Sequence, residues 1–62
     1  MTWDEHYATA DLGTLELELE SLHYYFDDCR DIGQGINTKE VAQEGALLRA
    51  LARLGVVRER WY

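Results

Sequence analysis

The sequence contains no proline, a single cysteine and no long hydrophobic run. With Cys29 as the only thiol, no disulfide can form within the chain, which favours a reducing, cytoplasmic setting. No apolar stretch approaches the roughly 18 residues that a membrane-spanning helix needs. The acidic start Met1–Glu5 also differs from the basic start of a signal peptide. We therefore expect neither a disulfide scaffold nor a membrane-spanning or secreted protein.

Positive charge is also scarce. Six Lys and Arg stand against twelve Asp and Glu, so this chain of 62 residues has a net charge of -6. Such a surface repels nucleic acid and anionic membranes, and neither is an expected partner. Hydrophobic residues still make up 47%, which is too many for a disordered acidic tail. Length and composition predict one compact acidic domain over residues 1–62, too small for a dinucleotide-binding fold or a barrel enzyme.

The charges are unevenly distributed along the chain. Residues 1–31 contain nine acidic side chains and one arginine, whereas residues 32–62 contain three acidic and five basic side chains. The asymmetry fits a specialised acidic surface, and it equally fits neutralisation of the acidic half by the basic half within the fold. The sequence leaves both interpretations open.

Three segments favour β-structure. Residues 14–20, Thr-Leu-Glu-Leu-Glu-Leu-Glu, alternate between apolar and acidic side chains, a pattern typical of a half-buried strand with its leucines towards the core. The preceding Ala10–Gly13 is typical of a turn, which would join residues 14–20 to an earlier strand at about 2–9. The β-branched and aromatic residues 56–62 predict a third strand.

Placed beside the strand at 14–20, the last strand would set Arg58 and Arg60 opposite the glutamates. Val57 and Trp61 would then turn inward. A helix competes with the first of these strands, because Leu and Glu are good helix formers. A helical spacing also connects five apolar residues: Leu12, Leu15, Leu19, Leu22 and Phe26.

Two further helices are predicted. Ser21 is a candidate N-cap for a helix at about 22–31, which the glycines of the following loop would end. Asn37 and Glu40 match a capping box for a helix at about 38–54. The apolar stripe of this last helix consists of Val41, Leu47, Leu48, Leu51 and Leu54.

Gly55 follows the last helix at the position of a C-terminal cap. Gly45, inside the helix, indicates close packing at that point. The helix is more apolar around its circumference than a small monomer easily covers, which points to a partner or a second copy against it. The predicted fold class is α+β in the order β-β-α-α-β, with an all-α helical hairpin as the alternative.

The chain offers few groups for catalysis or metal binding. Its strong transition-metal ligands are His6, His23 and Cys29, and their spacing matches no zinc motif. Asp27 and Asp28 are adjacent, so a helix would point them apart rather than pair them for acid–base chemistry. We therefore predict a protein that is not an enzyme and that binds no metal or cofactor.

The acidic residues of the first half form the candidate interaction site. In the strand interpretation, Glu16, Glu18 and Glu20 make a carboxylate row with a spacing of about 6.6 Å, twice the rise per residue. In the helical interpretation, one side still carries Glu16, Glu20, Asp27 and Asp31. A rigid row of carboxylates can imitate a phosphate backbone. The predicted partner-binding residues are Glu16, Glu18, Glu20, Tyr24, Asp27, Asp28 and Asp31.

In length and acidity the chain resembles the small phage-encoded inhibitors of host defence, of the anti-CRISPR and anti-restriction type. The resemblance covers size and charge and includes no motif, so it assigns no residue. It implies a non-enzymatic protein-binding module that mimics nucleic acid and inhibits a host defence system. The expected partner is a protein with a basic, nucleic-acid-binding surface, not nucleic acid itself or a membrane.

Two alternatives remain. Thr38–Ala42 and Leu47–Arg58 resemble the recognition helix and wing strand of winged-helix proteins, which implies a small DNA-binding regulator. Its phosphate contacts would come from Arg49, Arg53, Arg58 and Arg60. The other alternative is a structural or assembly subunit, a homodimer formed through the helix at 38–54 or through the C-terminal strand.

Overall fold

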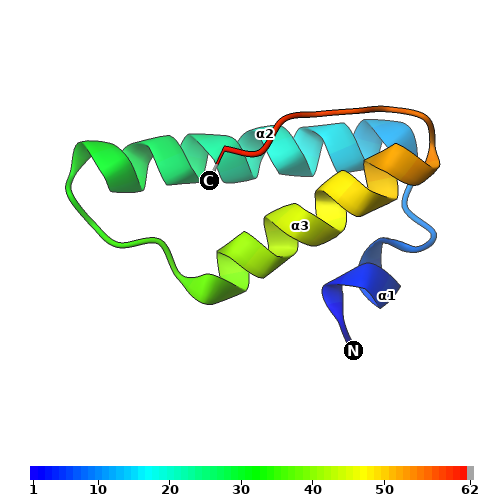
Figure 1. Ribbon diagram of the computed structural model, residues 1–62, viewed down its shortest axis with the longest axis horizontal. Coiled ribbons are helices and arrows are strands. Elements are labelled where there is room, and N and C mark those ends of the chain that lie inside the picture. Colours follow the sequence, from blue (N-terminus) through cyan, green and yellow to red (C-terminus); the bar gives the residue numbers. More distant parts are fainter. Residues whose placement is uncertain (62) are drawn as a thin grey trace.

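A computed structural model describes residues 1–61, which form three helices and an extended C-terminal segment, with no strand among them (Figure 1). The helices are α1 (Trp3–Tyr7), α2 (Leu12–Asp31) and α3 (Thr38–Arg53). α2 and α3 form an antiparallel hairpin, and α1 packs against α3. The predicted α+β fold in the order β-β-α-α-β is therefore wrong, and the alternative all-α helical hairpin matches the structure.

The segment predicted as a strand at 14–20 lies inside α2. The helix begins at its N-cap Asp11, whose Oδ1 accepts a hydrogen bond from the backbone N–H of Thr14 at 2.8 Å. The turn predicted at 10–13 is therefore the start of this helix. Ser21 lies near the middle of α2, so the N-cap predicted there is also wrong.

Burial along α2 follows the helical period instead of the strand period. Leu15 and Leu19 are 1% and 5% exposed, whereas Leu17 between them is 66% exposed. A strand would have turned all three leucines to one side. The same stripe continues through Leu22 and Phe26 and faces α3 across the core. The helix prevails because its stripe extends well beyond the six alternating residues.

The strand predicted at about 2–9 is replaced by α1. Thr2 is its N-cap and accepts a hydrogen bond from the backbone N–H of Glu5 at 3.1 Å. The helix has five residues, too few to be stable alone. It is held by packing, because Tyr7 is 2% exposed within the core formed by α2 and α3.

The two ends of α3 lie close to where the prediction placed them, but the side-chain contact at its start is not the predicted capping box of Asn37 with Glu40. Asn37 is the N-cap, and its side chain accepts from the backbone N–H of Lys39 at 2.9 Å. Gly55 has a φ of 81°, and the next residue, Val56, donates its N–H to the carbonyl oxygen of Leu51 at 3.0 Å. This is the hydrogen-bond pattern of a helix ended by a left-handed glycine. Gly33 ends α2 in the same way, with a φ of 74°.

α3 is covered on two sides within the chain itself. Leu47 and Leu51 are fully buried towards α2, and Ala46 and Ala50 are buried on the side where α1 packs. Leu54, predicted in the apolar stripe, is 53% exposed. α3 therefore contacts both α1 and α2, and a second copy against it stays a prediction.

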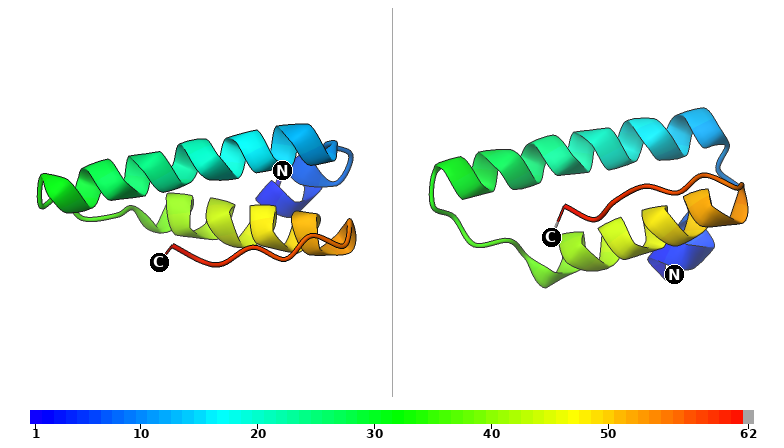
Figure 2. Two further views of the ribbon diagram at one scale, coloured as in Figure 1. Left: turned by 90° about the horizontal axis from the view of Figure 1, so that it is seen from above. Right: turned by 45° about the horizontal axis from the view of Figure 1, so that its top comes forward.

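The segment 56–61 is extended but forms no sheet within the described residues, so the predicted C-terminal strand is wrong there. Tyr62, the last residue of that predicted strand, lies outside the described residues. The segment runs back over the line along which α2 and α3 meet, on the side of α3 away from α1 (Figures 1 and 2). Trp61 packs against the core as predicted, whereas Val57 is 86% exposed instead of turned inward. Side chains, not strand pairing, hold this segment.

Within residues 1–61, none of the helices combines the length and the hydropathy required to cross a lipid bilayer.

Candidate functional site

A groove lies between the acidic side of α2 and the segment 56–61. Its volume is about 560 Å³. From α2 it is lined by Glu16, Leu19, Glu20, His23, Tyr24 and Asp27, and from the C-terminal segment by Arg58 and Glu59. Three of these α2 residues are predicted partner-binding carboxylates, and Tyr24, also predicted, is 66% exposed beside them. We call this surface the acidic groove.

The helix brings only some of the predicted residues together. Each step along a helix turns by 100°, so Glu18 points away from Glu16 and Glu20. Glu18 instead accepts a hydrogen bond from the hydroxyl of Tyr7, at 3.2 Å, on another side of α2. The regular carboxylate row with a spacing of about 6.6 Å, which depended on a strand, therefore does not exist. Asp28 and Asp31 are exposed on α2 but do not line the groove.

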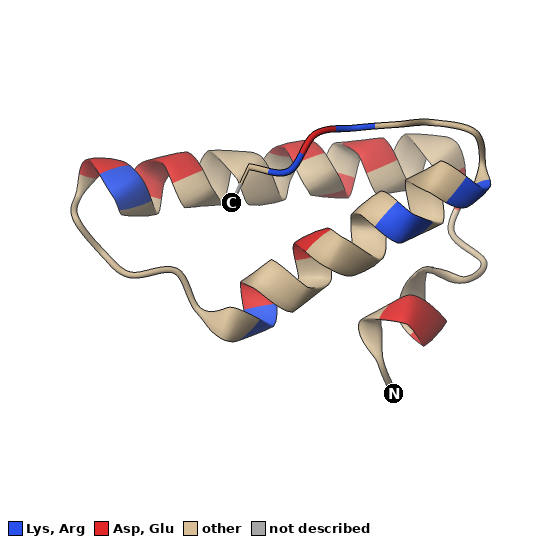
Figure 3. Cartoon of the chain, in the orientation of Figure 1, with Lys and Arg blue, Asp and Glu red and all other residues tan. Residues whose placement is uncertain are grey.

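The protein neutralises part of its acidic side with its own residues. Arg58 donates from Nη2 to Oε1 of Glu16 at 2.6 Å. Asp27 accepts from Nη2 of Arg30 at 3.2 Å and from the indole Nε1–H of Trp61 at 2.6 Å. Figure 3 shows the C-terminal segment, which carries blue basic positions, running along and across α2, where red acidic positions predominate. Internal neutralisation, one of the two interpretations of the charge asymmetry, is thus real but partial.

The remaining acidic residues of α2 are not neutralised in this way. Among the described residues, no ion pair reaches Glu20, Asp28 or Asp31. Glu20 lies inside the acidic groove, and Glu59 adds a further carboxylate from the opposite wall. Within residues 1–61, the groove therefore contains carboxylates that no ion pair neutralises, Glu20 and Glu59, whereas Asp28 and Asp31 carry their charge outside it.

A buried carboxylate anchors the far end of this segment. Glu44 of α3 is 1% exposed, and its Oε2 lies 2.7 Å from Nε2 of His23 on α2. The same oxygen accepts the backbone N–H of Trp61 at 2.7 Å. One oxygen thus joins α2, α3 and the C-terminal segment. Glu44 is not among the residues predicted from the sequence, although its position three residues before Leu47 places it on the apolar stripe of α3.

The indole ring of Trp61 completes this anchor. It lies 5.3 Å from the ring of Phe26, which is fully buried, and the guanidinium carbon of Arg30 lies 5.3 Å above it. An aromatic pair and a cation over the indole face are both favourable contacts. Together with Glu44, they fix the end of the segment more firmly than its exposed middle.

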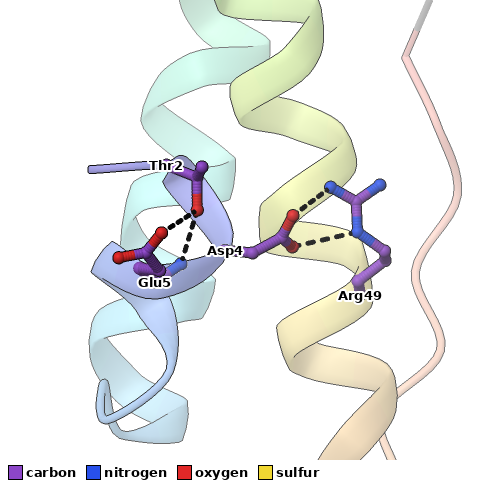
Figure 4. Close-up of polar contacts among 4 residues, drawn as sticks. All are labelled: Thr2, Asp4, Glu5 and Arg49. Atoms are coloured by element: carbon purple, nitrogen blue, oxygen red, sulfur yellow. Dashed lines mark hydrogen bonds and ion pairs between the residues drawn. The ribbon is translucent and has the colours of Figure 1, made fainter.

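A second set of charges fastens α1 to α3, away from the acidic groove (Figure 4). Arg49 donates from Nε and Nη2 to the two carboxylate oxygens of Asp4, both at 3.0 Å. This bidentate geometry is the strongest form of an arginine–carboxylate pair. A Cβ added to Gly45 would lie 3.2 Å from Nη1 of Arg49, so the close packing predicted at Gly45 is against this guanidinium.

We expect Arg49→Gln to raise the pKa of Asp4. The hydrogen bond from Arg49 is the main cause that lowers this pKa below its ordinary value of 3.8. A lowered pKa stabilises the fold above pH 3.8, and that contribution is lost as the pH falls through the folded-state pKa. Carboxyl-carbon NMR titration should show the Asp4 midpoint return towards 3.8 in the variant.

Asp11 provides the control for this titration. Its pKa is lowered by the hydrogen bond from the Thr14 backbone, which does not involve Arg49. The Asp11 midpoint should therefore be the same in both proteins. An Asp4 midpoint that does not move in the variant would show that the bidentate pair is not formed in solution.

Two other kinds of site considered from the sequence were a metal site and the DNA-binding surface of a winged-helix protein. No group of three His, Cys, Asp or Glu side chains within residues 1–61 is placed to hold a metal ion. Cys29 is a free, buried cysteine. Of the arginines that a winged-helix protein would direct at phosphates, Arg49 and Arg58 are in ion pairs with Asp4 and Glu16. No wing strand follows α3 in this part of the chain.

No family model, curated protein or solved structure matches the chain.

Proposed function

We propose that this chain is a non-enzymatic protein-binding module, whose acidic groove docks on the basic surface of a nucleic-acid-binding protein. The observation that carries the proposal is the position of Glu20, a carboxylate inside the groove that no ion pair reaches within residues 1–61. A carboxylate in that position is available to a cationic side chain of a partner. Tyr24 lies beside it and offers rigid, exposed contact area.

The electrostatics of the whole chain support the same proposal. The net charge of -6 attracts a basic protein and repels nucleic acid, so the expected complex forms by long-range attraction and weakens with salt. Because the regular row of carboxylates is absent, the proposal rests on the concentration of negative charge at the groove and not on its spacing. A module of this kind inhibits its partner by covering the surface that nucleic acid would occupy. With Cys29 free and buried, we place this function in the cytoplasm.

Protamine, an arginine-rich nucleic-acid-binding protein, is a suitable probe for this proposal. We expect fluorescently labelled protamine to bind the chain in fluorescence anisotropy, with an affinity that falls from low to physiological salt. Glu20→Gln should weaken binding by about 2–5-fold, the effect of one exposed charge pair. Short duplex DNA should compete with the chain for protamine.

Glu5→Gln is the matched control, because it removes the same charge from α1, away from the groove. It should weaken binding less than Glu20→Gln does. Equal effects of the two substitutions would mean that only net charge matters, and would overturn the acidic groove as the binding site. Binding that does not respond to salt would contradict the proposal as well.

A further inference from the structure

The segment 56–61 itself has a positively charged side chain of the kind that the acidic groove is proposed to bind. Arg58 places a guanidinium on Glu16, and Trp61 places an indole N–H on Asp27. Both carboxylates line the groove. Figure 1 shows this segment crossing in front of α2, and the left-hand view of Figure 2 shows it running beside α3. The protein therefore covers part of its own candidate site with a basic and aromatic segment.

The two ends of this cover are held with different strength. At Trp61 the backbone N–H reaches the buried Glu44, and the ring packs on the buried Phe26. Within residues 1–61, Arg58 forms one ion pair, and its two side chains are 49% and 39% exposed. An ion pair with this exposure contributes little stability and is readily exchanged for another. The segment is thus anchored at Trp61 and loosely closed at Arg58.

We propose that Arg58 is an internal competitor, which occupies Glu16 in the free protein and is displaced when a cationic partner binds the acidic groove. This inference rests on the proposed function and adds its regulation. The segment lowers the affinity for weakly basic surfaces, because every partner must first replace the contact between Arg58 and Glu16. Displacement of Arg58 widens the groove while the anchor at Trp61 keeps the rest of the segment in place.

The test compares two arginines of the same segment. Arg58→Gln and Arg60→Gln each remove one positive charge, but among the described residues only Arg58 forms an ion pair with α2. With labelled protamine as the probe, Arg58→Gln should tighten binding by about 2–5-fold relative to Arg60→Gln. Equal affinities of the two variants would show that only net charge matters and would overturn the competitor.

A second measurement reports the contact without any ligand. The carboxyl-carbon NMR signal of Glu16 should shift in Arg58→Gln and remain unchanged in Arg60→Gln. Adding protamine to the wild-type chain should move the Glu16 signal while the indole N–H signal of Trp61 changes much less. A Glu16 signal that is insensitive to Arg58→Gln would also overturn the inference.

The outcomes separate this inference from the proposed function. If protamine binding depends on Glu20 but the two arginine variants bind equally, the acidic groove remains the binding site and the competitor is wrong. If neither the wild-type chain nor Arg58→Gln binds protamine, both proposals are overturned. If only Arg58→Gln binds, the segment closes the groove more completely than the exposure of Arg58 indicates, and the competitor is supported.

Discussion

Leu15→Ala is expected to lower the free energy of unfolding by about 2–5 kcal/mol, whereas Leu17→Ala should change it by less than about 0.5 kcal/mol. The two leucines are two residues apart on α2, but they are 1% and 66% exposed. Alanine at the buried position leaves a cavity beside the core. At the exposed position it removes few contacts and keeps a high helix propensity.

Urea unfolding followed by far-UV circular dichroism measures both effects. A domain of 62 residues is expected to have only about 3–9 kcal/mol of stability, so Leu15→Ala can unfold it altogether. Leu15→Val keeps most of the side chain and serves as the milder variant. Similar losses at Leu15 and Leu17 would indicate that both side chains face one core, as in a strand, and would contradict the helix.

This pair of leucines also shows why the sequence alone predicted the wrong element. Over residues 14–20, a period of two and a helical period fit the same letters, and local propensity does not decide between them. The helical stripe becomes evident only when Leu22 and Phe26 are included. The turn predicted at 10–13 suggested a β-hairpin and so favoured the strand, although Asp11 is equally suited to be a helix N-cap.

The features that were predicted correctly depend on neighbouring residues. Asn37 caps α3 through a contact only two residues along the chain. The glycines that end α2 and α3 adopt positive φ because their side-chain-free backbone does so at little cost. Capping chemistry of this kind is short-range and can be recognised in the sequence.

The candidate site was predictable only in part. The helical interpretation placed Glu16, Glu20, Asp27 and Asp31 on one side of α2; the first three do line one groove, whereas Asp31 does not. The contact of Glu18 with Tyr7 and the closure of the groove by Arg58 depend on how distant segments pack. Such contacts follow from the tertiary fold. The wrong secondary structure predicted for the chain placed these segments incorrectly relative to one another.

Glu44→Ala is expected to destabilise the fold by about 2–4 kcal/mol. The carboxylate is 1% exposed, and one of its oxygens is shared by His23 and the backbone N–H of Trp61 at 2.7 Å each. Its removal leaves a cavity in the core and takes the acceptor from both partners. Glu44→Gln should destabilise the fold less than Glu44→Ala does, because the amide keeps the size of the side chain and one acceptor oxygen. Some loss of stability remains, because the substitution removes the charge.

Glu40→Ala is the control on the same helix. Within residues 1–61, the buried Oε2 of Glu40 has no hydrogen-bond partner, so Glu40→Ala removes an unpaired buried oxygen. The stability should change by no more than about 1 kcal/mol, mainly through lost interaction with the N-terminus of α3. Urea unfolding compares the two variants directly.

Hydrogen exchange at the backbone amide of Trp61 tests the mechanism behind the difference. In Glu44→Ala, this amide should lose its protection before the core amides of α2 and α3, because the segment detaches while the hairpin persists. In Glu40→Ala, its protection should be unchanged. Retained protection in Glu44→Ala would mean that the contacts of the indole ring, with Phe26 and Arg30, hold the segment without the carboxylate. Glu44 would then contribute only to the packing of the helical hairpin.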